Sequence, residues 1–113
     1  MKMKSKMGLI TMCRKAGKLQ IGMDMVKEAC RNGSASGVFI ADDLSSKSLK
    51  EIKFVCSRYG VNLYGLGLSM DEIWADLGKR AGIMAVTDSG LCKACAKDLE
   101  PVPASGDDFN SKK

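Results

Sequence analysis

The chain has 113 residues, of which 45% are hydrophobic and 27% are charged, and its net charge is +5. This length and composition are typical of one globular domain and exclude global disorder. No apolar run is long enough to cross a bilayer, and the charged first six residues are not followed by the apolar stretch of a secretory signal. We therefore expect a soluble cytoplasmic protein that has no membrane partner.

The positive charge is concentrated near the N-terminus. Residues 1–31 contain eight basic and two acidic residues, a net charge of +6, and the other 82 residues have a net charge of −1. This asymmetry favours one basic face and a polyanionic partner. A solvated helix face that keeps the protein soluble is the alternative interpretation.

Two helices are expected at the start of the chain. The apolar residues of 5–16 share one arc of a helix, and Gly17 ends it because glycine adopts a positive φ easily. The second helix is expected from Gly22 to about Arg31. Its core stripe consists of Met23, Val26, Ala29 and Cys30. Met25 points away from this stripe and is expected on the surface.

The middle of the chain combines two strands with a long helix. The continuous apolar run at 38–41 predicts a strand that is buried on both faces. We expect Asp42 and Asp43 to end this strand and to cap the third helix, which runs to about Arg58. The core side of that helix carries Leu49, Ile52, Cys56 and Tyr59. A second strand is expected over 61–65.

Capping signals mark the last two helices. Ser69 and Glu72 have the spacing of a capping box, which starts a fourth helix that continues through Leu77. After a third strand over 83–87, Asp88 is expected to cap the last helix. One face of that helix carries Leu91, Ala94 and Cys95.

The order of these elements indicates the fold class. Helices that alternate with short apolar strands predict an α/β fold, a three-layer α/β/α sandwich. We expect a single domain over residues 1–98. The segment 99–113 contains both prolines, small polar residues and mixed charges, and it is expected to be a disordered tail.

The composition argues against catalysis and against metal binding. The chain has no histidine, which removes the commonest general base and the usual metal ligand, and it has no glycine-rich nucleotide-binding loop. We predict no enzyme activity, no cofactor and no metal. The five cysteines are expected to be reduced and mostly buried. The spacing Cys92-x-x-Cys95 leaves a zinc site or a thiol sensor as alternatives.

Several short segments, in a fixed order, resemble one family. They are 16–22, Ala29, Gly33, 38–43, Gly60-Val61, 77–79 and 85–88. Together they span about residues 7–97 and resemble the kink-turn RNA-binding ribosomal-protein superfamily of the L-seven-Ae type, closest to its small bacterial YlxQ-like branch. The resemblance implies a mixed, mostly four-stranded sheet with a short strand near Lys18–Gln20, and it implies no catalysis.

The resemblance also implies an RNA surface made from two neighbouring segments. One is the turn at Gly17 with the helix start at Gly22, and the other is the loop before the last strand. The residues assigned to this surface are Gly17, Lys18, Gly22, Met23, Asp24, Met25, Lys27, Lys79, Arg80, Gly82 and Ile83. The basic side chains and the free N–H groups of the helix start can bind phosphates, and the first helical turn can read unpaired bases.

The sequence departs from the family pattern at four positions. Asp24, Met25 and Glu28 stand where ribosomal members carry an Asn-Glu pair and a lysine, and Trp74 stands where a glycine is usual. Asp24 can accept hydrogen bonds from base amino groups but cannot donate as asparagine does. Trp74 follows Met70 by one helical turn, so we expect it in the core rather than as a ligand platform.

Two functions from different classes are compatible with the sequence. The first is non-catalytic binding of structured RNA of the kink-turn or internal-loop type. Its expected target is ribosomal RNA, with the ribosome or assembly proteins as further partners. The second is a protein-interaction module on the same fold, in which RNA binding is weak or lost. We expect a monomer in both cases.

Overall fold

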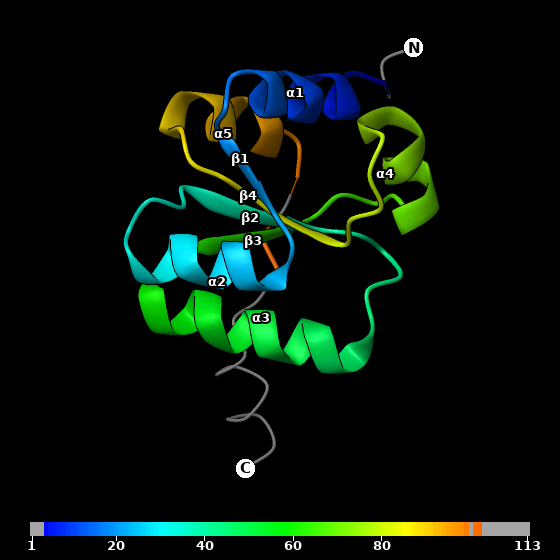
Figure 1. The fold of residues 1–113 in the computed structure, drawn as a ribbon. Helices are drawn as coiled ribbons and strands as arrows, with labels where there is room; N and C mark the ends of the chain where they lie inside the picture. Colours follow the sequence, from blue (N-terminus) through cyan, green and yellow to red (C-terminus); the bar gives the residue numbers. More distant parts are fainter. Residues whose placement is uncertain (1–3, 100, 103–113) are drawn as a thin grey trace.

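The computed structural model describes residues 4–99 and 101–102 of the chain, and the side chains among them from residue 7 onward. Helices and strands alternate along this part of the chain (Figure 1). In order they are α1 (Lys4–Lys15), β1 (Leu19–Ile21), α2 (Met23–Arg31), β2 (Gly37–Ile40), α3 (Ser46–Tyr59), β3 (Asn62–Gly65), α4 (Met70–Leu77), β4 (Ile83–Val86) and α5 (Ser89–Ala96).

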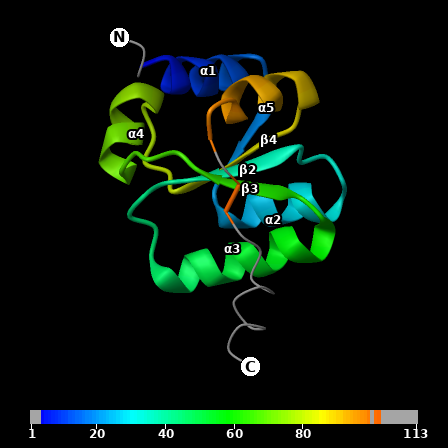
Figure 2. The same ribbon diagram turned by 180° about the vertical axis from the view of Figure 1, so that it is seen from behind.

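The four strands form one mixed sheet in the order β1-β4-β2-β3. Strands β2 and β3 are parallel, and β4 runs antiparallel to both of its neighbours. Helices α1, α4 and α5 cover one face of the sheet, and α2 and α3 cover the other (Figures 1 and 2). This confirms the predicted α/β/α sandwich, including the short first strand that the family resemblance implied.

The two central strands are buried on both faces, as the apolar run at 38–41 predicts. Successive side chains of a strand point to opposite faces of the sheet. Val38 therefore packs in the cluster beneath α2 and α3, and Phe39 packs in the cluster beneath α1, α4 and α5. Ile83 and Met84 of β4 divide between the clusters in the same way. The sheet thus lies between two hydrophobic cores, one on each of its faces.

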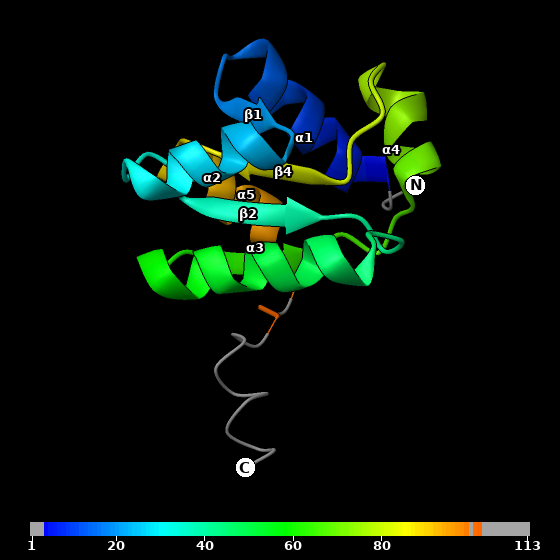
Figure 3. The same cartoon turned by 60° about the horizontal axis from the view of Figure 1, so that its bottom comes forward.

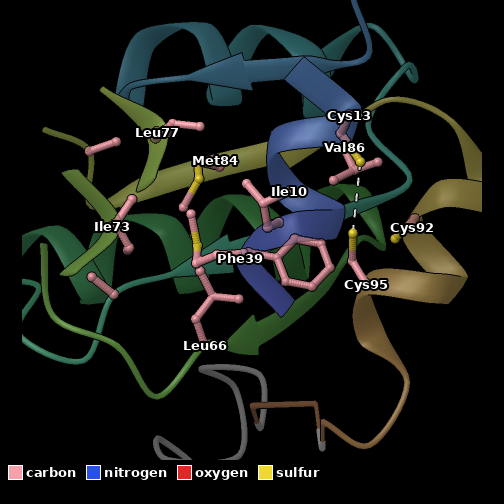
Figure 4. Packing of buried hydrophobic residues seen from close by; sticks show 13 residues of the cluster. Ile10, Cys13, Phe39, Leu66, Ile73, Leu77, Met84, Val86, Cys92 and Cys95 are labelled. Carbon is pink, nitrogen blue, oxygen red and sulfur yellow. Dashed lines mark hydrogen bonds between the residues drawn. The ribbon is translucent and has the colours of Figure 1, made fainter. Parts of the chain in front are cut away.

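The core beneath α1, α4 and α5 is built around Phe39 (Figure 4). Ile10 of α1 and Ile73 of α4 are fully buried there, and α5 contributes Cys92 and Cys95. The Sγ atoms of Cys13 and Cys95 lie 3.7 Å apart, which places α1 directly against α5. All five cysteines are buried free thiols, as the sequence predicts.

The pair Asp42-Asp43 does not cap α3. The N-cap of α3 is Ser45, whose hydroxyl accepts a hydrogen bond from the N–H of Ser48 at 3.2 Å. Asp43 instead accepts a hydrogen bond from the first N–H of α4, that of Met70, at 2.9 Å. The prediction was wrong because the loop after β2 passes beside the start of α4, a neighbour that sequence spacing does not show.

Two aromatic residues expected in the core lie on the surface. Trp74 is 50% exposed, because it lies about 100° around α4 from the fully buried Ile73. Tyr59 is 39% exposed, because it is the last residue of α3 and projects past the edge of the sheet. Val55 takes its place in the core. Met25 is 51% exposed, which confirms the prediction for that position.

The described part of the chain continues past residue 98, where the domain was expected to end. Leu99 packs against the core beneath α1, α4 and α5. Pro101 pairs with Tyr64 at the outer edge of β3, and the N–H of Val102 donates to the carbonyl oxygen of Leu63 at 2.7 Å. Residues 99, 101 and 102 thus contact the sandwich, and the rest of the expected tail, 103–113, lies outside the described part of the chain.

Candidate nucleic-acid interface

Gly22 joins the end of β1 to the start of α2. Its φ of 102° and ψ of 151° are accessible to glycine but strained for a residue that has a Cβ atom. Its N–H donates to the carbonyl oxygen of Ile83 at 3.0 Å, and its own carbonyl accepts the first hydrogen bond of α2, from Val26 at 2.9 Å. The helix start is therefore attached to the beginning of β4.

The loop before β4 is held in place at Gly82. The carbonyl oxygen of Gly82 accepts a hydrogen bond from the N–H of Ala41 at 2.9 Å. A Cβ atom at this position would lie 2.9 Å from Leu44 Cδ1 and 3.1 Å from Met70 Sδ. Glycine thus lets the loop pack closely against the residues that flank α3 and α4.

These two segments line one open groove of about 340 Å³, which we call the Gly22–Gly82 groove. Its lining residues are Ile21, Gly22, Met23, Leu44, Ser45, Ser48, Met70, Lys79, Arg80, Ala81, Gly82 and Ile83. Lys79 and Arg80 are the charged side chains among them, and both are exposed. The groove therefore has a largely apolar floor with two cations at its rim.

The start of α2 supplies hydrogen-bond donors beside this groove. The first intrahelical hydrogen bond is donated by Val26, so the N–H groups of Met23, Asp24 and Met25 precede the helical ladder. Gly22 has no side chain with which to cap them. Such a helix start favours an anionic group, and Asp24 and Met25 are exposed within the same turn.

Six residues of the groove are not among those assigned from the sequence. Ile21 and Ala81 adjoin assigned residues, and the other four come from distant segments. Leu44, Ser45 and Ser48 come from the beginning of α3, and Met70 is the first residue of α4. No local sequence signal could assign them, because they reach the groove only through the packing of α3 and α4 around the loop before β4.

Five of the sequence-assigned residues do not line the groove: Gly17, Lys18, Asp24, Met25 and Lys27. Gly17 and Lys18 lie at a distance from it. Lys18 occupies the opposite end of the β1–β4 pair, where its carbonyl oxygen accepts a hydrogen bond from Thr87 at 2.9 Å. Three residues of extended chain lie between Lys18 and Gly22, so the two are four steps, or about 13 Å, apart. Gly17, with a φ of 74°, forms the turn before Lys18. Both are exposed, and neither belongs to the groove.

Lys27 faces another groove, which has a volume of about 540 Å³ and lies between α2 and α3. It forms an ion pair with Glu51 of α3, and this hydrogen bond raises the pKa of the Lys27 ammonium group. Glu28, also in this groove, pairs with Arg31. Lys27 is therefore engaged within the protein, and the negative charge of Glu28 is offset by the Arg31 guanidinium.

The two cations at the groove rim have different surroundings. The guanidinium of Arg80 donates to a carboxylate oxygen of Asp71 at 2.7 Å and lies 6.0 Å from the ring centroid of Trp74. Within the described part of the chain, Lys79 has no ion-pair partner. Lys79 is thus available to a ligand anion, whereas Arg80 is held at the junction of the groove and α4.

Cys92 and Cys95 are both buried, and each has a neighbour outside α5. Cys95 contacts Cys13 of α1, and Cys92 lies beneath Gly37 of β2, where an added Cβ atom would come within 2.5 Å of its Sγ atom. Burial raises the pKa of both Cys13 and Cys92. Among the described residues, no group of three His, Cys, Asp or Glu side chains is placed to hold a metal ion.

The described helices are all too short or too polar to cross a bilayer.

Comparison with known proteins identifies the family. The sequence profile of the ribosomal protein L7Ae/L30e/S12e/Gadd45 family matches residues 4–96. The RNA-binding protein YlxQ of Enterococcus faecium is 33% identical over 94 residues, which make up 83% of this chain and 90% of that protein.

A solved structure shares the fold. It is that of a protein with unknown function from Bacillus halodurans C, which matches with a TM-score of 0.76 and 22% identity over 81% of this chain and 93% of its own. Both the family profile and the curated relative span most of the chain, including both sides of the Gly22–Gly82 groove. The chain therefore belongs to the ribosomal protein L7Ae/L30e/S12e/Gadd45 family.

Proposed function

We propose that this protein binds structured RNA of the kink-turn or internal-loop type, without catalysis, through the Gly22–Gly82 groove. The expected target is ribosomal RNA, bound by a monomer in the cytoplasm, with the ribosome or its assembly proteins nearby. The observation that carries the proposal is the hydrogen bond from the N–H of Gly22 to the carbonyl oxygen of Ile83. It places the donor-rich start of α2 beside the basic loop at Lys79 and Arg80.

The chemistry of the groove matches an RNA that is bent and partly unpaired. Backbone N–H groups at the start of α2 and the ammonium of Lys79 favour phosphate oxygens. The apolar floor, which includes Met23 and Ile83, suits the faces of bases that have left a helical stack. Asp24 lines the neighbouring groove between α2 and α3, and from the first turn of α2 it can accept hydrogen bonds from base amino groups. The relative YlxQ is described as an RNA-binding protein, which supports the same class of ligand.

Binding measurements with a ribosomal RNA fragment that contains a kink-turn test this proposal. We expect the affinity to fall with salt, by roughly 0.7–0.9 in log K per log unit of salt for each phosphate contacted. Lys79→Ala should reduce this slope by about one, since one phosphate contact is lost.

Lys18→Ala should weaken binding about equally for all RNAs, because phosphate contacts carry little sequence information. Met25→Glu should change the preference among RNAs.

The matched control is Lys93→Ala, which removes the same charge from an exposed position of α5. Helix α5 follows the end of β4 that is remote from the groove, so this variant should bind as the wild type does. The same RNA with its internal loop closed by Watson–Crick pairs should bind more weakly. Equal affinity for both RNAs, or equal losses in Lys79→Ala and Lys93→Ala, would contradict the proposal.

The groove between α2 and α3 favours protein interaction as the second candidate function. Phe54 is 60% exposed there, and the guanidinium of Arg58 lies 5.6 Å from the ring centroid of Tyr59. Aromatic residues and arginine are enriched at protein interfaces. If the wild type shows no RNA binding below micromolar concentrations at low salt, and pull-downs recover a protein that Phe54→Ala loses, this function replaces the first.

A further inference from the structure

Trp74 is a large apolar side chain on α4 that is not part of the core. The neighbouring Ile73 and Leu77 are buried and anchor the helix, whereas Trp74 is half exposed. The position is fixed by strong local structure. A capping box between Ser69 and Glu72 starts α4, and Gly78, with a φ of 77°, ends it by donating a hydrogen bond to the carbonyl oxygen of Trp74 at 2.8 Å. A large apolar ring is therefore presented to solvent from a rigid element.

Arg80 connects this ring to the Gly22–Gly82 groove. Its guanidinium lies 6.0 Å from the indole centroid, within the range of a cation–π contact, and Asp71 holds the same guanidinium from α4. Arg80 also lines the groove, as does Met70, which lies one helical turn before Trp74. The ring is thus linked to the groove through the side chain of Arg80.

We propose that Trp74 and Arg80 form a stacking site for one unpaired nucleobase of the RNA whose backbone occupies the Gly22–Gly82 groove. The inference rests on the proposed function and adds to it a contact outside the groove. An exposed indole ring stacks on any base, because every base has a π face, and a neighbouring guanidinium favours both the base and its phosphate. The site would therefore select an RNA that has an extruded base next to the bound loop, with little preference for which base.

A nucleobase fits this site better than an apolar protein side chain does. The ring has a charged neighbour, the Arg80 guanidinium, which is itself paired with Asp71, whereas the core of a protein interface is depleted in charge. The other large aromatic residues that are exposed in the described part of the chain, Phe54 and Tyr59, lie across the sheet on α3 (Figure 3). Trp74 is thus the aromatic side chain that shares a surface with the groove.

The experiment uses the fact that Trp74 is the only tryptophan in the sequence. The full-length protein is titrated with a kink-turn RNA under selective tryptophan excitation, and affinities of the variants are measured in parallel. We expect fluorescence quenching on binding. Trp74→Ala should weaken binding on the order of tenfold, and Trp74→Phe should recover part of this loss because a smaller ring still stacks. Phe54→Ala is the matched control and should bind as the wild type does.

Abasic substitutions in the RNA identify the stacked base. Removing the base at each unpaired position in turn keeps every phosphate, so one position should abolish the quenching and match the affinity loss of Trp74→Ala. In that RNA, the Trp74→Ala substitution should have no further effect. If the wild type binds the RNA without quenching and Trp74→Ala binds equally well, the stacking site is wrong and the proposed function stands. If the wild type binds no RNA, both proposals fall together.

Discussion

Gly22 and Gly8 illustrate how differently two glycines contribute to this protein. Gly22 adopts a φ of 102°, where a Cβ atom is strained, although no heavy atom lies within 4 Å of the place a Cβ would occupy. Gly8 lies inside α1 with ordinary helical geometry and open space around it. Neither position is sterically crowded, so a difference between alanine variants at the two positions reports the backbone conformation alone.

Gly22→Ala should lower the free energy of unfolding by about 1–3 kcal/mol, because alanine cannot adopt this backbone conformation without strain. Gly8→Ala should raise it by about 0.5–1 kcal/mol, because alanine is the better helix former. Urea denaturation of both variants and the wild type measures the two changes. Two changes of the same sign would contradict the assigned backbone conformation of Gly22. In RNA titrations, Gly22→Ala should also bind more weakly, since the start of α2 shifts relative to Ile83.

At the level of elements, α4 is held at its start by two separate segments. Ser69 and Glu72 form the capping box within the helix, and Asp43 accepts a hydrogen bond from Met70 across 27 residues of sequence. Arg14 of α1 donates to the carbonyl oxygen of Leu77 at the other end of α4. Helix α4, which carries Trp74 and borders the groove, is therefore fixed by contacts at both ends.

Asp43→Ala should destabilise the protein by about 1 kcal/mol, the usual cost of losing a side-chain acceptor at a helix start. Asp42→Ala is the matched control. Within the described part of the chain its carboxylate has no hydrogen-bond partner, and the loss should be close to zero. Thermal unfolding followed by circular dichroism distinguishes the two variants. Equal losses would mean that the charge of the pair matters and not the bond to Met70.

At the level of the whole molecule, buried thiols lie on both sides of the sheet. Burial raises the pKa of Cys13 and Cys92 in the core beneath α1, α4 and α5. In the other core, a hydrogen bond with Cys30, and then burial, raise the pKa of the Cys56 thiol. Each of these three thiols therefore holds its proton more tightly in the folded state than in the unfolded chain.

This difference makes the stability fall in alkaline solution. Below the ordinary thiol pKa of 9.0, both states are protonated and the thiols contribute fully to stability. Above it, the unfolded chain releases protons that the folded state retains, so unfolding becomes more favourable. We expect a lower urea midpoint at about pH 10 than at about pH 8, and a smaller difference in Cys92→Ala. Val86→Ala should instead shift both midpoints equally, and an unchanged pH difference in Cys92→Ala would contradict the assignment.

The sequence by itself determined the features that depend on near neighbours along the chain. The capping box at Ser69, the cap at Asp88 and the turn at Gly17 are confirmed because each involves residues within a few positions. The burial of β2 on both faces is confirmed. Its apolar run has no polar residue at alternate positions that could face solvent. The resemblance to the family supplied the short strand β1, which three residues alone do not indicate.

The tertiary structure decided which distant residues meet. It paired Asp43 with α4, extended the fold to Val102, engaged Lys27 with Glu51, and left Trp74 on the surface beside Arg80. In the folded chain, Lys18 lies at a distance from the Gly22–Gly82 groove. The physical reason is that helices and turns are set by bonds between near neighbours, whereas a groove is the space left when elements far apart in sequence pack against one sheet.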